Sequence, residues 1–165
     1  MSTVDSTLFK QVMARFPSGV TVITMKVDGS VHGMTASAFS SLSLEPPLVL
    51  VCVGKNQQSH KLLAQGKHYV VNFLQDGQEE LSNHFSRPRP AGGEEFEGIP
   101  SRPGPNGAPL LEGCLAYASC DVKEVLPGGD HDIFVGHVKH LEIPSAQEHD
   151  NPLLYFKGRY RRLAE

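Results

Sequence analysis

The chain has 165 residues, 39% of them hydrophobic and 20% charged, with a formal net charge of −3. These values are typical of one globular domain, here residues 1–165, and the dispersed charge argues against a nucleic-acid partner, which usually leaves a basic stripe. No apolar run approaches the ~20 residues of a membrane span. The first ten residues lack the basic and apolar regions of a secretory signal. We therefore expect a cytoplasmic protein.

The three cysteines, Cys52, Cys114 and Cys120, indicate neither a disulfide framework nor a zinc ribbon, because their number is odd and no CxxC occurs. On one extended strand, Cys114 and Cys120 would lie roughly 20 Å apart at ~3.3 Å per residue, too far to bridge. Cys52 lies in an apolar run and is expected to be a small core residue. All three thiols should be reduced.

The N-terminal part predicts a helix followed by a β-hairpin. Four large apolar side chains repeat at helical spacing and mark one face of the helix: Phe9, Val12, Met13 and Phe16. Pro17 disfavours helix at the residue before it, so the helix should end near Phe16. The following segment, GVTVITMKV, is rich in β-branched residues, and Asp28-Gly29 after it predicts a hairpin turn.

The middle of the chain predicts a buried strand and a short helix. Pro46 and Pro47 precede LVLVCV, which is apolar on both faces and so predicts a central strand. NQQSHKLLAQG predicts a helix, with Asn56 or Ser59 as its cap and Gly66 as its end.

The remaining elements complete a chain dominated by strands. HYVVNFL predicts a strand, and Asp76 with Glu79 resembles a capping box that opens another helix. Residues 88–109 are rich in Pro, Gly and Glu and predict a long surface excursion. CLAYASCDVKEV and DIFVGHVKHLEI predict a long hairpin, and PLLYFKGRYRRL predicts a final strand. With two or three short helices and no regular βαβ alternation, this order favours a closed or nearly closed antiparallel barrel over a Rossmann sheet.

The common catalytic and metal motifs are missing from the sequence. It contains no GxxxxGK[ST], no GxGxxG after a strand, no HExxH and no GxSxG. His131, His137 and His140 suggest a metal site, but on one strand His140 would face away from the other two. We expect ordinary polar histidines and no metal.

The stretch HGMTASAFSS, residues 32–41, has two readings. Its small side chains can let backbones pack closely in a strand with a bulge. They can equally let main-chain groups reach a flat ligand, with hydroxyls added by Thr35, Ser37 and Ser41.

Three more polar positions have a structural and a functional reading each. Ser59-His60, at the start of a predicted helix, could cap it or favour an anion. Arg87, just past another helix, could bind phosphate or helix carbonyls. His131, in a glycine-rich turn, could be solvated or lie at the rim of a site.

Several of these fragments occur together in one order along the chain. They are FPSGVTVIT, HGMTASAFSSLSLEPPLVLVCV, SH within NQQSHKLL, NFL, HFSR, GDHDIFVG and PLLYFKGRY. From about residue 8 to residue 163 the sequence resembles the flavin reductase-like family, the short-chain NAD(P)H:flavin oxidoreductases that serve two-component flavin monooxygenases. The resemblance implies a mainly β fold, an antiparallel six-stranded split β-barrel (FMN-binding split barrel) with short flanking helices, and usually a homodimer.

The resemblance also implies roles for individual residues. Those along the flavin ring would be Met34, Thr35, Ala36 and Ser37, with Ser41 nearby. The ribityl chain would lie close to Cys52 and Val53. The flavin phosphate would be approached by Ser59 and His60 and covered by Phe85, Ser86 and Arg87. The nicotinamide nucleotide would be faced by His131, the candidate catalytic residue, and by Tyr155, Phe156, Lys157 and Gly158. The commonest family form has Asn at the position of Ser37.

The implied reaction is hydride transfer from NADH or NADPH to FMN or FAD, with the reduced flavin supplied to a partner monooxygenase. The flavin carries the reactivity, so no acid–base pair of side chains is needed. Two other functions stay open: a flavin-binding or electron-transfer protein without reductase activity, and a protein-interaction barrel that has lost its ligand.

Overall fold

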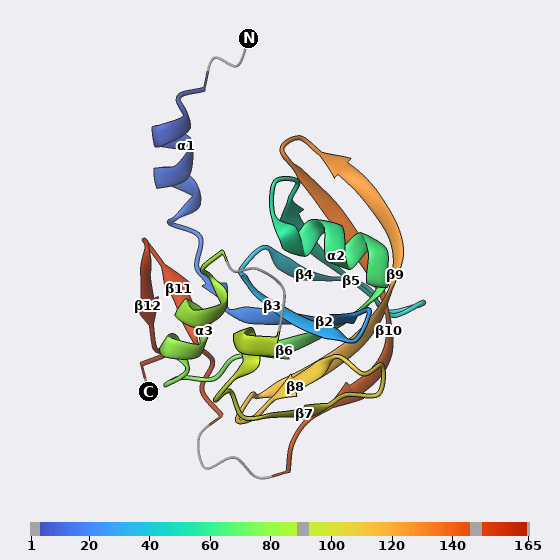
Figure 1. The fold of residues 1–165 in the computed structure, drawn as a ribbon. Coiled ribbons are helices and arrows are strands. Elements are labelled where there is room, and N and C mark those ends of the chain that lie inside the picture. The colour runs from blue at the N-terminus through green and yellow to red at the C-terminus, as the bar shows by residue number, and fades with distance from the viewer. Residues whose placement is uncertain (1–3, 89–92, 146–149, 165) are drawn as a thin grey trace.

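The computed structural model describes residues 4–88, 93–145 and 150–164. It is mainly β, and its centre is one antiparallel sheet of seven strands (Figure 1). The strands are β2 (Thr21–Val27), β3 (Ser30–Ala36), β4 (Phe39–Ser43), β5 (Leu48–Gly54), β6 (His68–Phe73), β9 (Ala116–Gly128) and β10 (His131–Glu142). Their order across the sheet is β3-β2-β6-β9-β10-β5-β4.

The two edge strands of this sheet, β3 and β4, are neighbours in the sequence. Only Ser37 and Ala38 separate the end of β3 from the start of β4. The sheet must therefore curl until its two edges lie near each other. Within the described residues β3 pairs with β2 and β4 pairs with β5, and no pairing joins the two edges. The predicted antiparallel, mainly β fold is confirmed, whereas the six-stranded split barrel is not, because the sheet has seven strands and no closed barrel is found among the described residues.

The predicted hairpins occur in the sheet. Asp28 and Gly29 turn β2 into β3 with φ values of 50° and 82°, and positive φ at both central residues is what a type I′ turn needs. The long hairpin of β9 and β10 is also confirmed, although its register shifts after Val135 and after Val138. These irregularities break the simple alternation on which the comparison of His131, His137 and His140 depended.

Two small sheets flank the large one. Their strands are β1 (Ser18–Gly19), β11 (Leu154–Phe156) and β12 (Arg159–Arg161) in the first, and β7 (Ser101–Pro103) and β8 (Pro109–Leu111) in the second. The single final strand predicted for PLLYFKGRYRRL is wrong, because Lys157 and Gly158 have φ values of 51° and 73° and reverse the chain. The resulting hairpin pairs with β1.

Among the described residues, three α-helices and one 3-10 turn complete the fold: α1 (Ser6–Met13), α2 (Gln58–Gly66), α3 (Glu79–Phe85) and η1 (Gly93–Phe96). Helix α1 ends three residues earlier than the proline rule predicted, and none of its residues is buried. It projects from the rest of the molecule (Figure 1).

The predicted N-caps of α2 and α3 are wrong, whereas the predicted end of α2 at Gly66 is confirmed. Helix α2 has Gln57 as its N-cap without a side-chain hydrogen bond, and its last residue is Gly66, followed by Lys67 in a left-handed conformation. Helix α3 has Gln78 as its N-cap. Asp76 instead forms an ion pair with Arg162 at 2.8 Å, so its carboxylate binds the C-terminal segment and does not cap the helix.

Strand β2 separates two apolar clusters because it is buried on both faces. Ile23 and Met25 face the interior of the curled sheet, where they pack with side chains such as Phe134. Val20 and Val22 face the other cluster, which includes Phe85 from α3. Burial on both sides fixes β2, and its partner β3 is thereby held at the edge where the candidate site lies.

Candidate functional site

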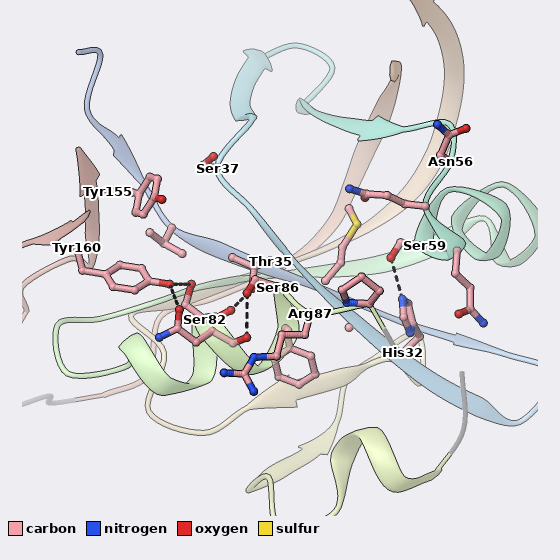
Figure 2. Close-up of a pocket in the computed structure, with 18 of the residues that line it drawn as sticks. His32, Thr35, Ser37, Asn56, Ser59, Ser82, Ser86, Arg87, Tyr155 and Tyr160 are labelled. Carbon is pink, nitrogen blue, oxygen red and sulfur yellow. Dashed lines mark hydrogen bonds between the residues drawn. The ribbon is translucent and has the colours of Figure 1, made fainter. Parts of the chain in front are cut away.

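A cavity of about 620 Å³ lies along β3, between the start of α2, the end of α3 and the hairpin of β11 and β12 (Figure 2). Its volume is within the range of small-molecule sites in proteins, ~300–1,000 Å³. Nine of the residues predicted to contact flavin or nucleotide line it: Met34, Thr35, Ser37, Ser59, Phe85, Ser86, Arg87, Tyr155 and Gly158.

The β3 wall of the cavity combines small residues with a fixed backbone. Thr35 Oγ1 donates a hydrogen bond to the carbonyl of Ser82 at 2.6 Å, which ties the strand to α3. A Cβ at Gly33 would lie 2.5 Å from the ring of Phe85, so glycine is required for this close approach. Ser37 is exposed at the end of the strand. The wall therefore combines small residues at Gly33, Thr35 and Ser37 with the side chains of His32 and Met34.

The opposite part of the cavity is formed by the first turn of α2. Ser59 Oγ lies 2.8 Å from His32 Nε2, and His32 Nδ1 lies 2.7 Å from Glu95 Oε2. All three side chains are buried. Glu95 Oε1 also accepts from the backbone N–H of Gly33 at 3.3 Å. Sequence reasoning missed His32 and Glu95, because Glu95 comes from the distant excursion that was expected only at the surface.

The third side of the cavity is built by α3 and the C-terminal hairpin. The hydroxyl of Tyr160 lies 2.9 Å from Ser82 Oγ and 2.9 Å from Asn83 Oδ1. The ring of Tyr155 packs edge-on against Tyr160 at 5.5 Å between centroids. Arg87 follows α3 and lines the same side. Tyr160 therefore connects the C-terminal hairpin to the helix that carries the predicted phosphate residues.

Eight predicted site residues do not line this cavity. They are Ala36, Ser41, Cys52, Val53, His60, His131, Phe156 and Lys157. Ala36 and Val53 are buried in the core. His131 is exposed at the β9–β10 turn, where its Nδ1 lies 2.8 Å from Asp130 Oδ1.

Cys52 and Ser37 line a second hollow, of about 550 Å³, on the other side of the β3–β4 link. Ser37 is the one predicted residue found in both linings. Two of the predicted flavin residues, Ser37 and Cys52, thus line the second hollow, and Ser37 is shared with the first cavity.

His60 points away from the cavity toward β10. Its Nε2 lies 2.7 Å from Asp132 Oδ2, and Lys55 Nζ lies 3.3 Å from the other oxygen of that carboxylate. The hydrogen bond from His60 lowers the pKa of Asp132 below its usual value, with a further contribution from Lys55. Next to each other in sequence, Ser59 faces the cavity and His60 anchors the helix to the sheet.

The described part of the chain shows neither a disulfide nor a group of side chains placed to bind a metal ion. Burial raises the pKa values of Cys114 and Cys120 to about 12, so these thiols stay protonated near neutral pH. No disulfide joins the three cysteines. Among residues 4–88, 93–145 and 150–164, no group of three or more His, Cys, Asp and Glu side chains is placed to hold a metal ion. No helix there is long and apolar enough to cross a membrane.

Most of the length of the chain carries a family signature. Residues 13–164 match the family described as the flavin reductase like domain. The chain belongs to this family. A flavin reductase like domain must accommodate a flavin, which has a planar ring and an anionic tail. The cavity suits both, because hydroxyls, amides and Arg87 line it and no carboxylate does among its described lining residues.

Curated relatives of this flavin reductase like domain share much of its sequence. An NADH-dependent FAD reductase of Streptomyces globisporus is 40% identical over 163 residues, covering 97% of this chain and 87% of the relative. The reductase component of 4-hydroxyphenylacetate 3-monooxygenase from Thermus thermophilus is 41% identical over 155 residues, covering 94% and 95% of the two chains.

Solved structures show the same fold. The NADH:FAD oxidoreductase SgcE6 of Streptomyces globisporus C-1027 superposes with a TM-score of 0.91 at 37% identity, covering 100% of this chain and 97% of that one. The flavin reductase PheA2 in its native state gives 0.85 at 37% identity, with coverage of 98% and 100%.

The His60–Asp132 contact predicts a measurable change in acid titration. Because the pKa of Asp132 is lowered in the folded protein, its contribution to stability is present above the unfolded-state pKa and is lost as the pH falls through the folded-state pKa. In His60→Ala, the Asp132 pKa should rise toward its usual value, as followed by NMR of the side-chain carboxyl carbon.

His68→Ala is the matched control, since His68 contacts a different carboxylate, Asp121, at 2.7 Å. That variant should leave the titration of Asp132 in place. An unchanged Asp132 pKa in His60→Ala would show that the contact does not determine it.

Proposed function

We propose that residues 1–165 form a single domain that acts as an NAD(P)H-dependent flavin reductase and supplies reduced FMN or FAD to a partner monooxygenase. The observation that carries this function is the 620 Å³ cavity, lined by nine of the predicted residues in a chain that matches the flavin reductase family from residue 13 to residue 164. Relatives named as an NADH-dependent FAD reductase and as a monooxygenase reductase component support the donor and the partner.

We infer that NADH and FAD are the preferred pair. Support comes from the solved structure of the Streptomyces globisporus oxidoreductase, which is described in complex with NAD and FAD fragments and is 36% identical to this chain. Arg159, Arg161 and Arg162, near the C-terminus, are candidates to bind the 2′-phosphate of NADPH. None of them lines the cavity, which has Arg87 as its one arginine among the described residues.

In the proposed complex, the flavin ring lies along the main chain of residues 34–37, with Ser41 beyond the link and Cys52 and Val53 toward the ribityl chain. The exposed side chain of Ser37 supports this, because it leaves the end of β3 open to the cavity, while the ring of Phe85 packs against Gly33 and forms the neighbouring part of the lining. The flavin phosphate lies by Ser59 and His60, under Phe85, Ser86 and Arg87. Here Ser59 is the direct contact and His60 holds the helix through Asp132.

The nicotinamide nucleotide is proposed to approach from the C-terminal hairpin. Tyr155 and Gly158 line the cavity from that side, and Phe156 and Lys157 complete the turn. His131 lies at a different rim. It pairs with Gly54 on β5, and Gly54 shortly precedes the cavity residues Asn56 and Gln57 in the sequence. We retain it as the candidate for nucleotide positioning.

A bound flavin would supply the redox chemistry by accepting hydride from the nicotinamide. The chain's own residues would orient the two rings and keep water away from them. Main-chain N–H groups near Ser37 can stabilise negative charge on the ring edge without a titrating side chain. This division of labour accounts for a cavity whose described lining residues include no carboxylate.

Three further inferences follow from the family. The curled sheet with adjacent unpaired edges is best understood as a split barrel, of the six-stranded type with one added strand. A cytoplasmic location suits three cysteines that no disulfide joins. A homodimer would cover the apolar face of α1, where Leu8, Phe9, Val12 and Met13 are at least half exposed.

The homodimer predicts that a charge on α1 separates the subunits. Phe9 is 56% exposed on a helix without buried residues, so Phe9→Glu should leave the fold intact and halve the mass measured by light scattering. Lys10→Glu, on the same helix, is the control and should stay dimeric. A wild-type protein that is already monomeric would contradict the proposal.

The reductase function predicts flavin-dependent oxidation of NADH by the purified protein, followed at the absorbance of NADH with FMN and FAD in turn. His131→Ala should raise the KM for the nucleotide more than the Kd for flavin. Tight flavin binding without nucleotide oxidation would instead indicate a flavin-binding or electron-transfer protein. Failure to bind either flavin would indicate an interaction barrel.

The role of the β3–β4 link predicts a separation between affinity and stability. Ser37→Leu adds bulk at an exposed position in the cavity wall, so flavin affinity should fall by about tenfold, or ~1.4 kcal/mol. The free energy of unfolding in urea should change by no more than about 0.5 kcal/mol. Ser101→Leu, at an exposed position on β7, should change neither. A Ser37→Leu protein that binds flavin normally would show that the link is not part of the site.

A further inference from the structure

A buried pair of ionisable groups lies beneath the cavity and has no part in the proposed hydride transfer. His32 is 6% exposed and Glu95 is 3% exposed, and their side chains meet at 2.7 Å. His32 also lines the cavity. Since buried ionisable groups are costly unless they are paired, such a pair is expected to have a use.

The hydrogen bonds of His32 determine what Ser59 can offer to a ligand. If His32 carries one proton, on Nδ1 toward the Glu95 carboxylate, then Nε2 can only accept, and Ser59 must donate its single proton to it. Ser59 Oγ is then only an acceptor toward the cavity. If His32 carries two protons, Nε2 donates to Ser59, whose own O–H becomes available for a ligand.

The charged groups around the cavity make the number of protons on His32 important for ligand binding. Its described lining includes one arginine, one histidine and no carboxylate or lysine. In Figure 2 the guanidinium of Arg87 points away from Ser59, toward the side of Ser82 and Ser86. His32 is therefore the group beside Ser59 that can take up a positive charge, and Glu95 behind it can compensate the charge that a second proton brings.

We propose that Glu95 and His32 form a proton-linked positioning pair, in which a phosphate of the flavin tail bound at Ser59 favours the doubly protonated state of His32. The proton comes from solvent, Nε2–H then donates to Ser59 Oγ, and Ser59 donates to the phosphate oxygen. By linkage, phosphate binding and protonation strengthen each other equally. This inference rests on the proposed flavin site and adds a pH dependence to its affinity.

Few other titratable groups in the described chain face this pair. From η1 the facing group is Glu95 itself, whose backbone carbonyl accepts from His84 Nε2 of α3 at 2.7 Å. Helix α2 contributes Ser59 and turns His60 away to Asp132. On β2 the residue paired with His32 is Met25, which cannot titrate.

The test compares FMN with riboflavin, which has the same ring and ribityl chain but no phosphate. Flavin dissociation constants of the full chain are measured by fluorescence quenching at about pH 7 and about pH 9, where the phosphate is already a dianion. The preference for FMN over riboflavin should fall by about tenfold across this range, while riboflavin affinity stays nearly constant. Calorimetry in two buffers of different ionisation enthalpy should show proton uptake with FMN only.

Glu95→Gln removes the compensating charge with little change in shape. This variant should lose most of the FMN preference at about pH 7, together with its pH dependence. Glu94→Gln, an exposed neighbour on η1, is the control and should match the wild type in both.

A pH-independent FMN preference in the wild type would overturn the inference while leaving flavin binding and NADH oxidation in place. So would a Glu95→Gln protein with unchanged FMN preference and pH dependence. A wild-type protein that binds neither flavin would overturn both this inference and the proposed function. The wild-type comparison needs no variant, so the inference can be decided even if Glu95→Gln does not fold.

Discussion

The two-residue connection between β3 and β4 is the constraint on which the rest of the structure depends. These strands form opposite edges of a seven-stranded sheet, yet only Ser37 and Ala38 separate them. Three virtual bonds of ~3.8 Å keep the strand ends within ~11 Å of each other. A sheet whose edges are held so closely must curl, and its interior becomes the apolar cluster around Phe134. The cavity and the second hollow lie on either side of the connection.

Polar groups fix the elements around this curled sheet. Asn72, fully buried on β6, donates to the carbonyl of Val22 and accepts from the backbone N–H of Leu111 at 2.8 Å, which attaches β8 to the sheet. The buried side chain of Glu95 attaches η1 to β3 in a similar way. Burying such groups is favourable only when their hydrogen bonds are satisfied. The described part of the excursion, residues 93–109, is therefore integrated into the fold, because η1 is bound to β3 and β7 pairs with β8.

Sequence patterns predicted the features that depend on neighbouring residues. The Asp28-Gly29 turn, the long hairpin and the hydroxyls of Thr35, Ser37 and Ser59 in the cavity lining could be read from local signals, whereas Ser82 and Tyr160 of the same lining were not predicted. The caps of α2 and α3 could not, because Ser59 and Asp76 bind groups distant in sequence, His32 and Arg162. The same limit explains why Glu95 was missed: a single acidic residue in a Pro- and Gly-rich segment carries no sign of the histidine it will meet.

The small residues along β3 that line the proposed flavin site have a consequence for sequence divergence. At Gly33 the constraint is steric, since any side chain would meet the ring of Phe85. At Ser37 the side chain is exposed, so the residue there is limited by the room that the cavity leaves and not by packing in the core. Mutational drift can therefore change the polar groups along β3 while the site persists. Selection on this stretch would act chiefly on side-chain volume, and relatives with different residues here can keep one geometry.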